Sequence, residues 1–427
     1  MKLPMLFRFS LYGFLKNQQY YDPFILLFLW QEKGLSFFLI GLLIGFRELM
    51  VNLMEVPTGV VADLCGRRRS MILSLSSYIV AFLIFGLAPG VWPLFAAMVF
   101  FAVGEAFRTG THKAMILDWL RLDGRESEKT KTYGYTRSWS KVGSAVAVVI
   151  AAAIVIATGS YYTTFLFATI PYVLGIVNFL GYPPELEGRP RAPATLGNIL
   201  RHLWQAFRQA FLDRRLRRVL LESMGYEGTH KVTKDYLQAV VKQLVVLVPA
   251  VPVLASLHEK GRVAILAGLF YFPLYLLSGM ASRKAVAVAR RFGGESRAAR
   301  AVWLLTLAIF AATTAALAAG YFWVAALGFV ATALVQNLWR PITITRVDNE
   351  TDASMGATML SIESQAKAVG AMALAPLLGL AVDKLGTSGQ PALWAVGALG
   401  AVIALAGSLL PTMQPAEAER LHWAGEV

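Results

Sequence analysis

Twelve long apolar runs between residues 9 and 411 are the feature that most constrains this 427-residue chain. A membrane-spanning helix needs about 20 mostly apolar residues, and each run is close to that length or longer. Because only 15% of the residues are charged, against about 25% in soluble domains, the sequence predicts an all-α membrane protein. The predicted transmembrane helices are 9–30, 35–62, 70–88, 91–118, 138–158, 161–182, 219–254, 262–282, 301–319, 321–345, 356–382 and 391–411.

Basic residues concentrate in alternate connections between the predicted helices. They fill residues 67–69, 121–137, 183–217 and 283–300, whereas the connections on the other side hold few. Because cytoplasmic loops are rich in Lys and Arg, we expect both termini in the cytoplasm and the chain in a bacterial inner membrane. Arg facing anionic lipid accounts for the net charge of +14, so no nucleic-acid partner is expected.

A polar stretch over residues 183–217 divides the predicted helices into two groups of six. We therefore expect an N-terminal half over 1–182, a C-terminal half over 218–412 and a cytoplasmic tail over 413–427. Within the linker, apolar residues recur at helical spacing, which predicts an amphipathic helix on the inner leaflet. The alternative is a linker with accidental periodicity. These apolar residues are Leu196, Leu200, Leu203, Phe207 and Phe211.

The first predicted helix of each half is unusually polar. The first half has Lys16, Asn17, Gln18, Gln19 and Asp22 there, and the second half has His230, Lys231, Lys234 and Asp235. Many secondary transporters are built from two such repeats, with the binding site between them near the middle of the membrane. The repeated polar pattern favours the same organisation here.

A short motif lies between the second and third predicted helices. It reads Gly59-Val-Val-Ala-Asp63-Leu-Cys-Gly66-Arg67-Arg68-Arg69 and resembles the signature loop of the major facilitator superfamily. This resemblance implies a twelve-helix fold of two pseudo-repeat halves and a gating loop made by Gly59, Asp63, Gly66, Arg67 and Arg68. Gly66 suits a tight turn, and Asp63 can face a helix N-terminus and pair with basic residues. The alternative is a short basic loop that obeys only the topology rule.

Three further segments bear on this resemblance. The corresponding loop of the second half, residues 278–284, has Ser282 where the family often has Asp, so a symmetric latch is not expected. The segment Glu55-Val-Pro57-Thr58-Gly59 resembles bacterial members, many of which are exporters. The segment 104–110 resembles the fourth helix of proton-linked members, which implies a role for Arg108.

Ionisable residues lie within the predicted helices, where each costs at least about 3 kcal/mol unless it faces a partner or a wet cavity. They fall on helices that the resemblance places around a central cavity. We expect the cations to bind an anionic or polar solute and the acids to carry a coupling proton. The expected substrate-binding residues are Lys16, Gln19, Asn52, Arg108, His230, Lys234 and Arg340. The expected proton-coupling residues are Asp22, Glu48, Glu105 and Asp235.

Each of these charges also has a purely structural interpretation. Glu227, Lys231 and Asp235 are spaced for ion pairs within one helix, as are Glu363 and Lys367. Neighbouring Arg47 and Glu48 point about 100° apart, which favours partners on different helices. Near a helix end, Arg340 and Arg346 can extend to the interface. His112 and His230 can be hydrogen-bonded packing residues.

Several kinds of active site are missing from the sequence. There is no Gly-x-x-x-x-Gly-Lys-Ser/Thr phosphate loop, no His-Glu-x-x-His pattern and only one Cys. We therefore expect no enzyme activity, no cofactor and no metal. The leading hypothesis is a secondary active transporter that exports a small polar or anionic organic solute in exchange for protons, as a monomer in membrane lipid. The alternatives are an organic-anion uptake symporter and a non-transporting sensor or assembly protein of the same fold.

Overall fold

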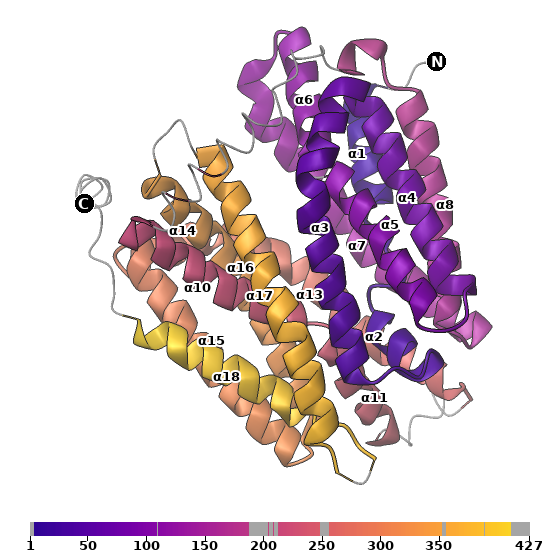
Figure 1. Ribbon diagram of the computed structural model, residues 1–427, viewed down its shortest axis with the longest axis vertical. Helices are drawn as coiled ribbons and strands as arrows, with labels where there is room; N and C mark the ends of the chain where they lie inside the picture. Colours follow the sequence, from indigo (N-terminus) through magenta and orange to yellow (C-terminus); the bar gives the residue numbers. More distant parts are fainter. Residues whose placement is uncertain are drawn as a thin grey trace. The chain divides into compact units, whose positions relative to one another are not determined.

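The computed structural model describes residues 4–108, 110–187, 204, 208, 212–247, 256–351, 356–387 and 389–410. These residues form helices joined by short connections, and only an isolated bridge between Thr387 and Gln390 has β geometry (Figure 1). Nine helices in the described ranges are long and apolar enough to cross a membrane. The predicted all-α membrane fold is therefore confirmed. The predicted linker helix and the 413–427 tail fall outside the described residues, apart from a few positions of the linker.

Contacts group the chain into two compact units. Unit 1 contains Met1–Leu35, Phe46–Ala194 and Val248–Leu276, and unit 2 contains Ser36–Gly45, Thr195–Leu247 and Leu277–Val427. Each unit is built mainly from one predicted half. Two helices, α3 (Phe37–Cys65) and α13 (Glu259–Arg283), have residues in both units.

Unit 1 is a helical bundle with an aromatic core. Within it α4 packs against α5 and α8, and α1 packs against α7 (Figure 1). The ring of Tyr21 contacts the rings of Phe82 and Phe165 in the core. Its elements are α1 (Met5–Leu15), α2 (Ile25–Leu27), the π-helical turn η1 (Phe28–Glu32), α4 (Arg67–Leu87), α5 (Trp92–Arg108), α6 (Thr111–Leu122), the 3-10 turn η2 (Glu126–Glu128), α7 (Lys129–Thr158), α8 (Tyr162–Leu180) and the 3-10 turn η3 (Pro184–Glu187).

Unit 2 packs α15 against α16 and α18, and α10 against α17. Its core includes a stack of Tyr226 on Trp339, with Trp303 edge-on to both. A Cβ atom on Gly228 would lie 3.1 Å from the backbone of Gly370, so glycine permits the close approach of α10 and α17. The elements are α10 (Arg214–Thr233), α11 (Tyr236–Leu247), α14 (Ala285–Arg291), α15 (Glu295–Ala318), α16 (Phe322–Asn349), α17 (Gly356–Lys384) and α18 (Trp394–Leu409).

The first predicted helix of each half is interrupted, which corrects the expected continuous helices 9–30 and 219–254. In the first half α1 ends at Leu15, and residues 16–24 are non-helical before α2 begins. In the second half Lys234 and Asp235 separate α10 from α11. The polar sequences at both breaks explain the interruption, and Pro23 in the first has no amide hydrogen to donate. When each broken helix is taken as one span and the 16-residue α18 is included, the described helices fit the twelve predicted spans.

A third break divides the predicted helix 91–118 into α5 and α6. Gly110 lies there with a φ of 79°, a conformation that glycine adopts readily. The remaining predicted helices are continuous in the described residues, with ends that differ by several residues. For example, α7 begins at Lys129 rather than at residue 138, because its polar first turns extend beyond the apolar run.

Candidate functional site

The break in the first helix carries three of the predicted site residues. Lys16 caps the end of α1, is partly exposed, and its Nζ lies 5.8 Å from the centre of the Tyr12 ring. Gln19 is partly exposed in the same non-helical segment. The Oη atom of Tyr275 donates a hydrogen bond of 2.6 Å to Asp22 Oδ2. Non-helical backbone at membrane depth is tolerated where protein or water surrounds it, so this segment is a candidate ligand-binding region.

The second group in unit 1 is the Arg108 cluster, which we define as Tyr78, Glu105 and Arg108. Arg108 Nη2 lies 2.5 Å from Glu105 Oε2, and the Tyr78 hydroxyl donates to the same carboxylate. The guanidinium also lies 5.8 Å from the centre of the Tyr78 ring. The structure therefore joins Arg108, predicted to bind substrate, with Glu105, predicted to carry a proton.

Two further predicted residues of unit 1 lie on α3. Arg47 Nη2 is 2.9 Å from Glu48 Oε1, so these neighbours form an ion pair with each other. This pairing between neighbours was not expected from the sequence, and it forms because the long Arg side chain bends across the angle between adjacent positions. Asn52 is partly exposed, and no described residue forms a hydrogen bond with its side chain.

Unit 2 contains the Glu363 cluster, which we define as Ser223, Arg340, Glu363 and Lys367. The side chain of Glu363 is 0% exposed, with Oε1 2.6 Å from Arg340 Nη1 and Oε2 3.2 Å from Lys367 Nζ. The hydroxyl of Ser223 also donates to this carboxylate. One buried acid therefore holds a cation from α16 and one from α17. The interface position expected as an alternative for Arg340 is wrong, because Glu363 holds its guanidinium.

Two other buried acids of unit 2 also contact α16. Glu227 accepts hydrogen bonds of 3.0 and 3.3 Å from the Gln336 amide. Glu222 binds Arg346 at 2.6 Å, and both side chains are less than 5% exposed. The expectation that Arg346 extends to the interface is wrong, because this buried carboxylate binds it.

The break in the second half positions two more predicted residues. Lys234 Nζ lies 3.1 Å from Asp235 Oδ1. His230, one turn earlier, lines a cavity of about 10 Å³ with Tyr226 and Trp303. This cavity has room for about one water molecule and is too small for an organic solute. Among the predicted residues of this unit, Arg340 belongs to the Glu363 cluster and Lys234 to a separate pair.

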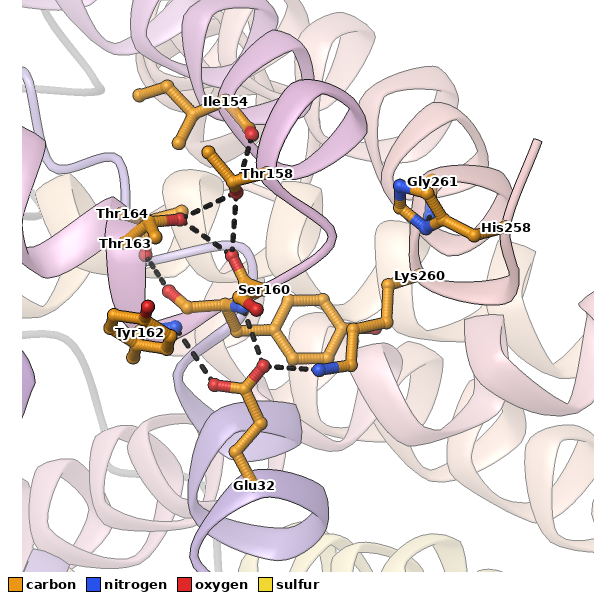
Figure 2. A network of polar contacts seen from close by, with 11 residues as sticks. Glu32, Ile154, Thr158, Ser160, Tyr162, Thr163, Thr164, His258, Lys260 and Gly261 are labelled. Carbon is orange, nitrogen blue, oxygen red and sulfur yellow. Dashed lines mark hydrogen bonds and ion pairs between the residues drawn. The ribbon is translucent and has the colours of Figure 1, made fainter. Parts of the chain in front are cut away.

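A network around Glu32 joins the π-helical turn η1 to the start of α8 and to the start of α13. Glu32 accepts hydrogen bonds from the backbone N–H of Tyr161 at 2.7 Å and of Tyr162 at 2.9 Å, at the start of α8. Its Oε1 atom lies 2.5 Å from Lys260 Nζ on α13 (Figure 2). Burial lowers the pKa of the adjacent Lys33, and the negative charge of Glu32 raises that pKa by a smaller amount. Residues of both predicted halves thus share one carboxylate.

The glycine–arginine motif spans the junction of α3 and α4, and Gly66 is its one residue between the two helices. Gly66 has a φ of 93° at the N-terminus of α4, as its turn role predicts, and Gly59 lies exposed within α3. Arg67 forms an ion pair with Asp118 of α6, and Arg68 Nε lies 3.3 Å from Glu187 of η3. Asp63 belongs to α3, and its side chain lies outside the described part of the structure. The described motif arginines thus contact acids of α6 and of the 3-10 turn η3.

Sequence reasoning assigned no transport role to Glu227, Glu363 or Lys367. Their helical spacing had favoured pairing within one helix, and that spacing contains no information about Gln336 or Arg340 on α16.

His112 packs against the rings of Phe9 and Tyr12, in accord with its packing alternative. No group of three or more potential metal ligands occurs in the part of the chain that the structure describes.

The sequence model of the family described as Major Facilitator Superfamily matches residues 13–364. No curated protein matches the sequence. Similar solved structures include a point mutant of the nucleoside transporter NupG, with 12% identity, a TM-score of 0.77, and coverage of 95% of this chain and 98% of that one. A POT family transporter in complex with 5-aminolevulinic acid has 14% identity, a TM-score of 0.70 and 94% coverage of both chains. A D-xylose-proton symporter has 13% identity, a TM-score of 0.66, and coverage of 96% and 98%.

Proposed function

Because the chain belongs to the major facilitator superfamily, we propose that it moves a small polar or anionic organic solute by alternating access, coupled to protons. Membership of the superfamily makes it an integral membrane transporter rather than an enzyme. The proposal concerns the solute, the coupling ion and the direction.

The observation that carries the proposal is the interruption of the first helix in each half. Both interruptions fall on charged residues, at Lys16 to Asp22 and at Lys234–Asp235. In secondary transporters, paired breaks of this kind free backbone groups and place them where substrate and coupling ion bind. A scaffold protein gains nothing from charged, unwound segments at these positions, which favours transport over a non-transporting role.

Proton coupling requires an acid whose partners change during the cycle. Asp22 meets this requirement because it lies in a non-helical segment and accepts a hydrogen bond from Tyr275 of α13. Protonation would turn this carboxylate from an acceptor into a donor and would remove a charge from the break. Glu105 is the second candidate, because a solute that binds Arg108 competes for the same guanidinium. Glu48 and Asp235 are further candidates and are paired with Arg47 and Lys234.

The cations favour an anionic solute. Arg108 and Arg340 present planar guanidinium groups, which suit carboxylate or phosphate oxygens. Arg108 contacts Glu105 in the structure, and Arg340 contacts Glu363. When an anion enters, either guanidinium would therefore exchange its carboxylate partner for the anion. The proposed direction is export, supported by the likeness of residues 55–59 to bacterial exporters.

A thermal-shift screen of the purified protein tests the solute class. Matched anions, cations and neutral compounds are added in detergent at two pH values, and the unfolding midpoint is measured. We expect anions to raise the midpoint, because a ligand that binds only the folded state stabilises it, and Arg108→Gln to abolish the rise. Stabilisation by cations instead, lost in Asp22→Asn or Glu105→Gln, would overturn the anion proposal in favour of cation export.

A further inference from the structure

A polar cavity of about 250 Å³ lies within unit 1, beside the start of the break in the first helix. It is formed by α1, α6, α7 and the first two residues of the non-helical segment. Hydroxyl, amide and cationic side chains supply most of its wall, and Phe9, Ile116 and Tyr133 supply an apolar side. The complete lining is Phe9, Gly13, Lys16, Asn17, His112, Ile116, Tyr133, Thr136, Arg137, Ser140, Lys141 and Ser144.

Three of the lining residues are cations, and none is an acid. Among the described residues, no carboxylate forms an ion pair with Lys16, Arg137 or Lys141. Arg137 repels both lysines electrostatically, while Glu105 attracts Lys16 from outside the lining. This differs from the Arg108 and Glu363 clusters, where every arginine contacts a carboxylate. Three cations that form no ion pair with a described residue surround one polar cavity, so they attract an anion and gain stability when it binds.

The cationic groups of the wall act as hydrogen-bond donors only. Lysine and arginine side chains donate and cannot accept. The Ser140 hydroxyl is engaged only at 3.4 Å, by the Thr136 carbonyl, so it can turn toward a ligand at little cost. The Nε2 atom of His112 is buried without a hydrogen-bond partner in the described chain. The complementary ligand therefore carries several acceptor oxygens.

We propose that this cavity binds the anionic end of a small organic acid with two negative charges, as a dicarboxylate or a phosphate. The assignment rests on the proposed function and makes Lys16, Arg137 and Lys141 its solute-binding residues. The volume is below the about 300–1,000 Å³ of pockets for drug-sized ligands, so the solute is small. Arg108 does not line this cavity and pairs with Glu105.

Titration calorimetry of the protein in nanodiscs of neutral phosphatidylcholine tests the site. The probes are succinate, inorganic phosphate and the uncharged isostere succinamide. We expect both anions to bind and succinamide not to bind. Arg137→Gln and Lys141→Gln should each weaken anion binding by about tenfold or more, since each removes a charged hydrogen-bond donor. Lys131→Gln is the matched control, because Lys131 is exposed on the same helix and does not line the cavity.

The unfolding midpoint without ligand checks that the variants are folded. It should stay equal or rise in Arg137→Gln and Lys141→Gln, because each substitution relieves repulsion between cations. Equal anion affinity in these variants and in Lys131→Gln would overturn the site. Stabilisation by nanodiscs of phosphatidylglycerol, with no binding of either soluble anion, would overturn the solute assignment and identify a lipid headgroup as the ligand.

Failure of the cavity and failure of the proposed function give different results. If an anion drives proton movement in liposomes but the two variants bind it normally, the cavity assignment is wrong and the transport proposal stands. If the variants lose anion binding but no anion moves under any gradient, the cavity is an anion site and the transport proposal is wrong.

Discussion

At the scale of single residues, several buried charges in this protein pair with a charge of opposite sign. Glu222 and Arg346 are both less than 5% exposed and lie 2.6 Å apart, and Glu222 also binds Arg218. Sequence analysis located such residues, because a charge in an apolar run is conspicuous. It could not identify their partners, since a pair such as these two joins positions more than a hundred residues apart, and only packing brings them together.

Removing one member of this buried pair should be strongly destabilising. Arg346→Met leaves Glu222 without one of its two cations, and breaking a buried pair costs about 3–5 kcal/mol. We expect a clear drop in the midpoint of thermal unfolding in detergent.

The matched control is Arg215→Met. Arg215 is 55% exposed and lies 4.0 Å from Glu350, so its loss should change stability by less than about 1 kcal/mol. Equal midpoints for Arg346→Met and Arg215→Met would contradict the role given to the buried pair.

At the scale of helices, the breaks in α1 and α10 were only partly predictable. The polar residues of both first helices were visible in the sequence, and their correspondence suggested a repeat. Apolar content alone predicted continuous helices over 9–30 and 219–254, because hydropathy averages over a window and ignores local backbone geometry. The interruption depends on residues that satisfy the freed backbone groups, such as Tyr172, which donates to the Lys16 carbonyl at 3.2 Å.

The Glu32 network makes a prediction at the same scale. Glu32→Gln keeps the shape of the side chain but removes the charge that pairs with Lys260 and caps α8. We expect a loss of about 1–2 kcal/mol in unfolding free energy, from the weaker cap and the lost ion pair. Chemical denaturation of the two proteins in the same detergent measures the difference.

Glu185→Gln serves as the comparison for this experiment. Glu185 is exposed and forms no hydrogen bond or ion pair with another described residue, so its substitution should leave stability unchanged. If Glu32→Gln were as stable as Glu185→Gln, the network would contribute nothing to the fold.

At the scale of the whole molecule, the sequence predicted the class and the family. The apolar runs gave the helical membrane fold, and the motif at residues 59–69 gave the superfamily whose model matches residues 13–364. The two compact units were not predicted in detail. Residues 36–45 belong to unit 2 and 248–276 to unit 1, so α3 and α13 contribute to both units, a property that the linear order of the chain does not reveal.

The most direct test of the central claim is proton movement driven by solute in liposomes. The purified protein is reconstituted with a pH-sensitive dye inside, and the anion that stabilises it most is added outside. We predict a change in internal pH that depends on the anion gradient and disappears in Asp22→Asn. It should persist in Asp123→Asn, whose side chain is 49% exposed in a connection. Anion transport without proton movement, or wild-type proton movement in Asp22→Asn, would contradict the account.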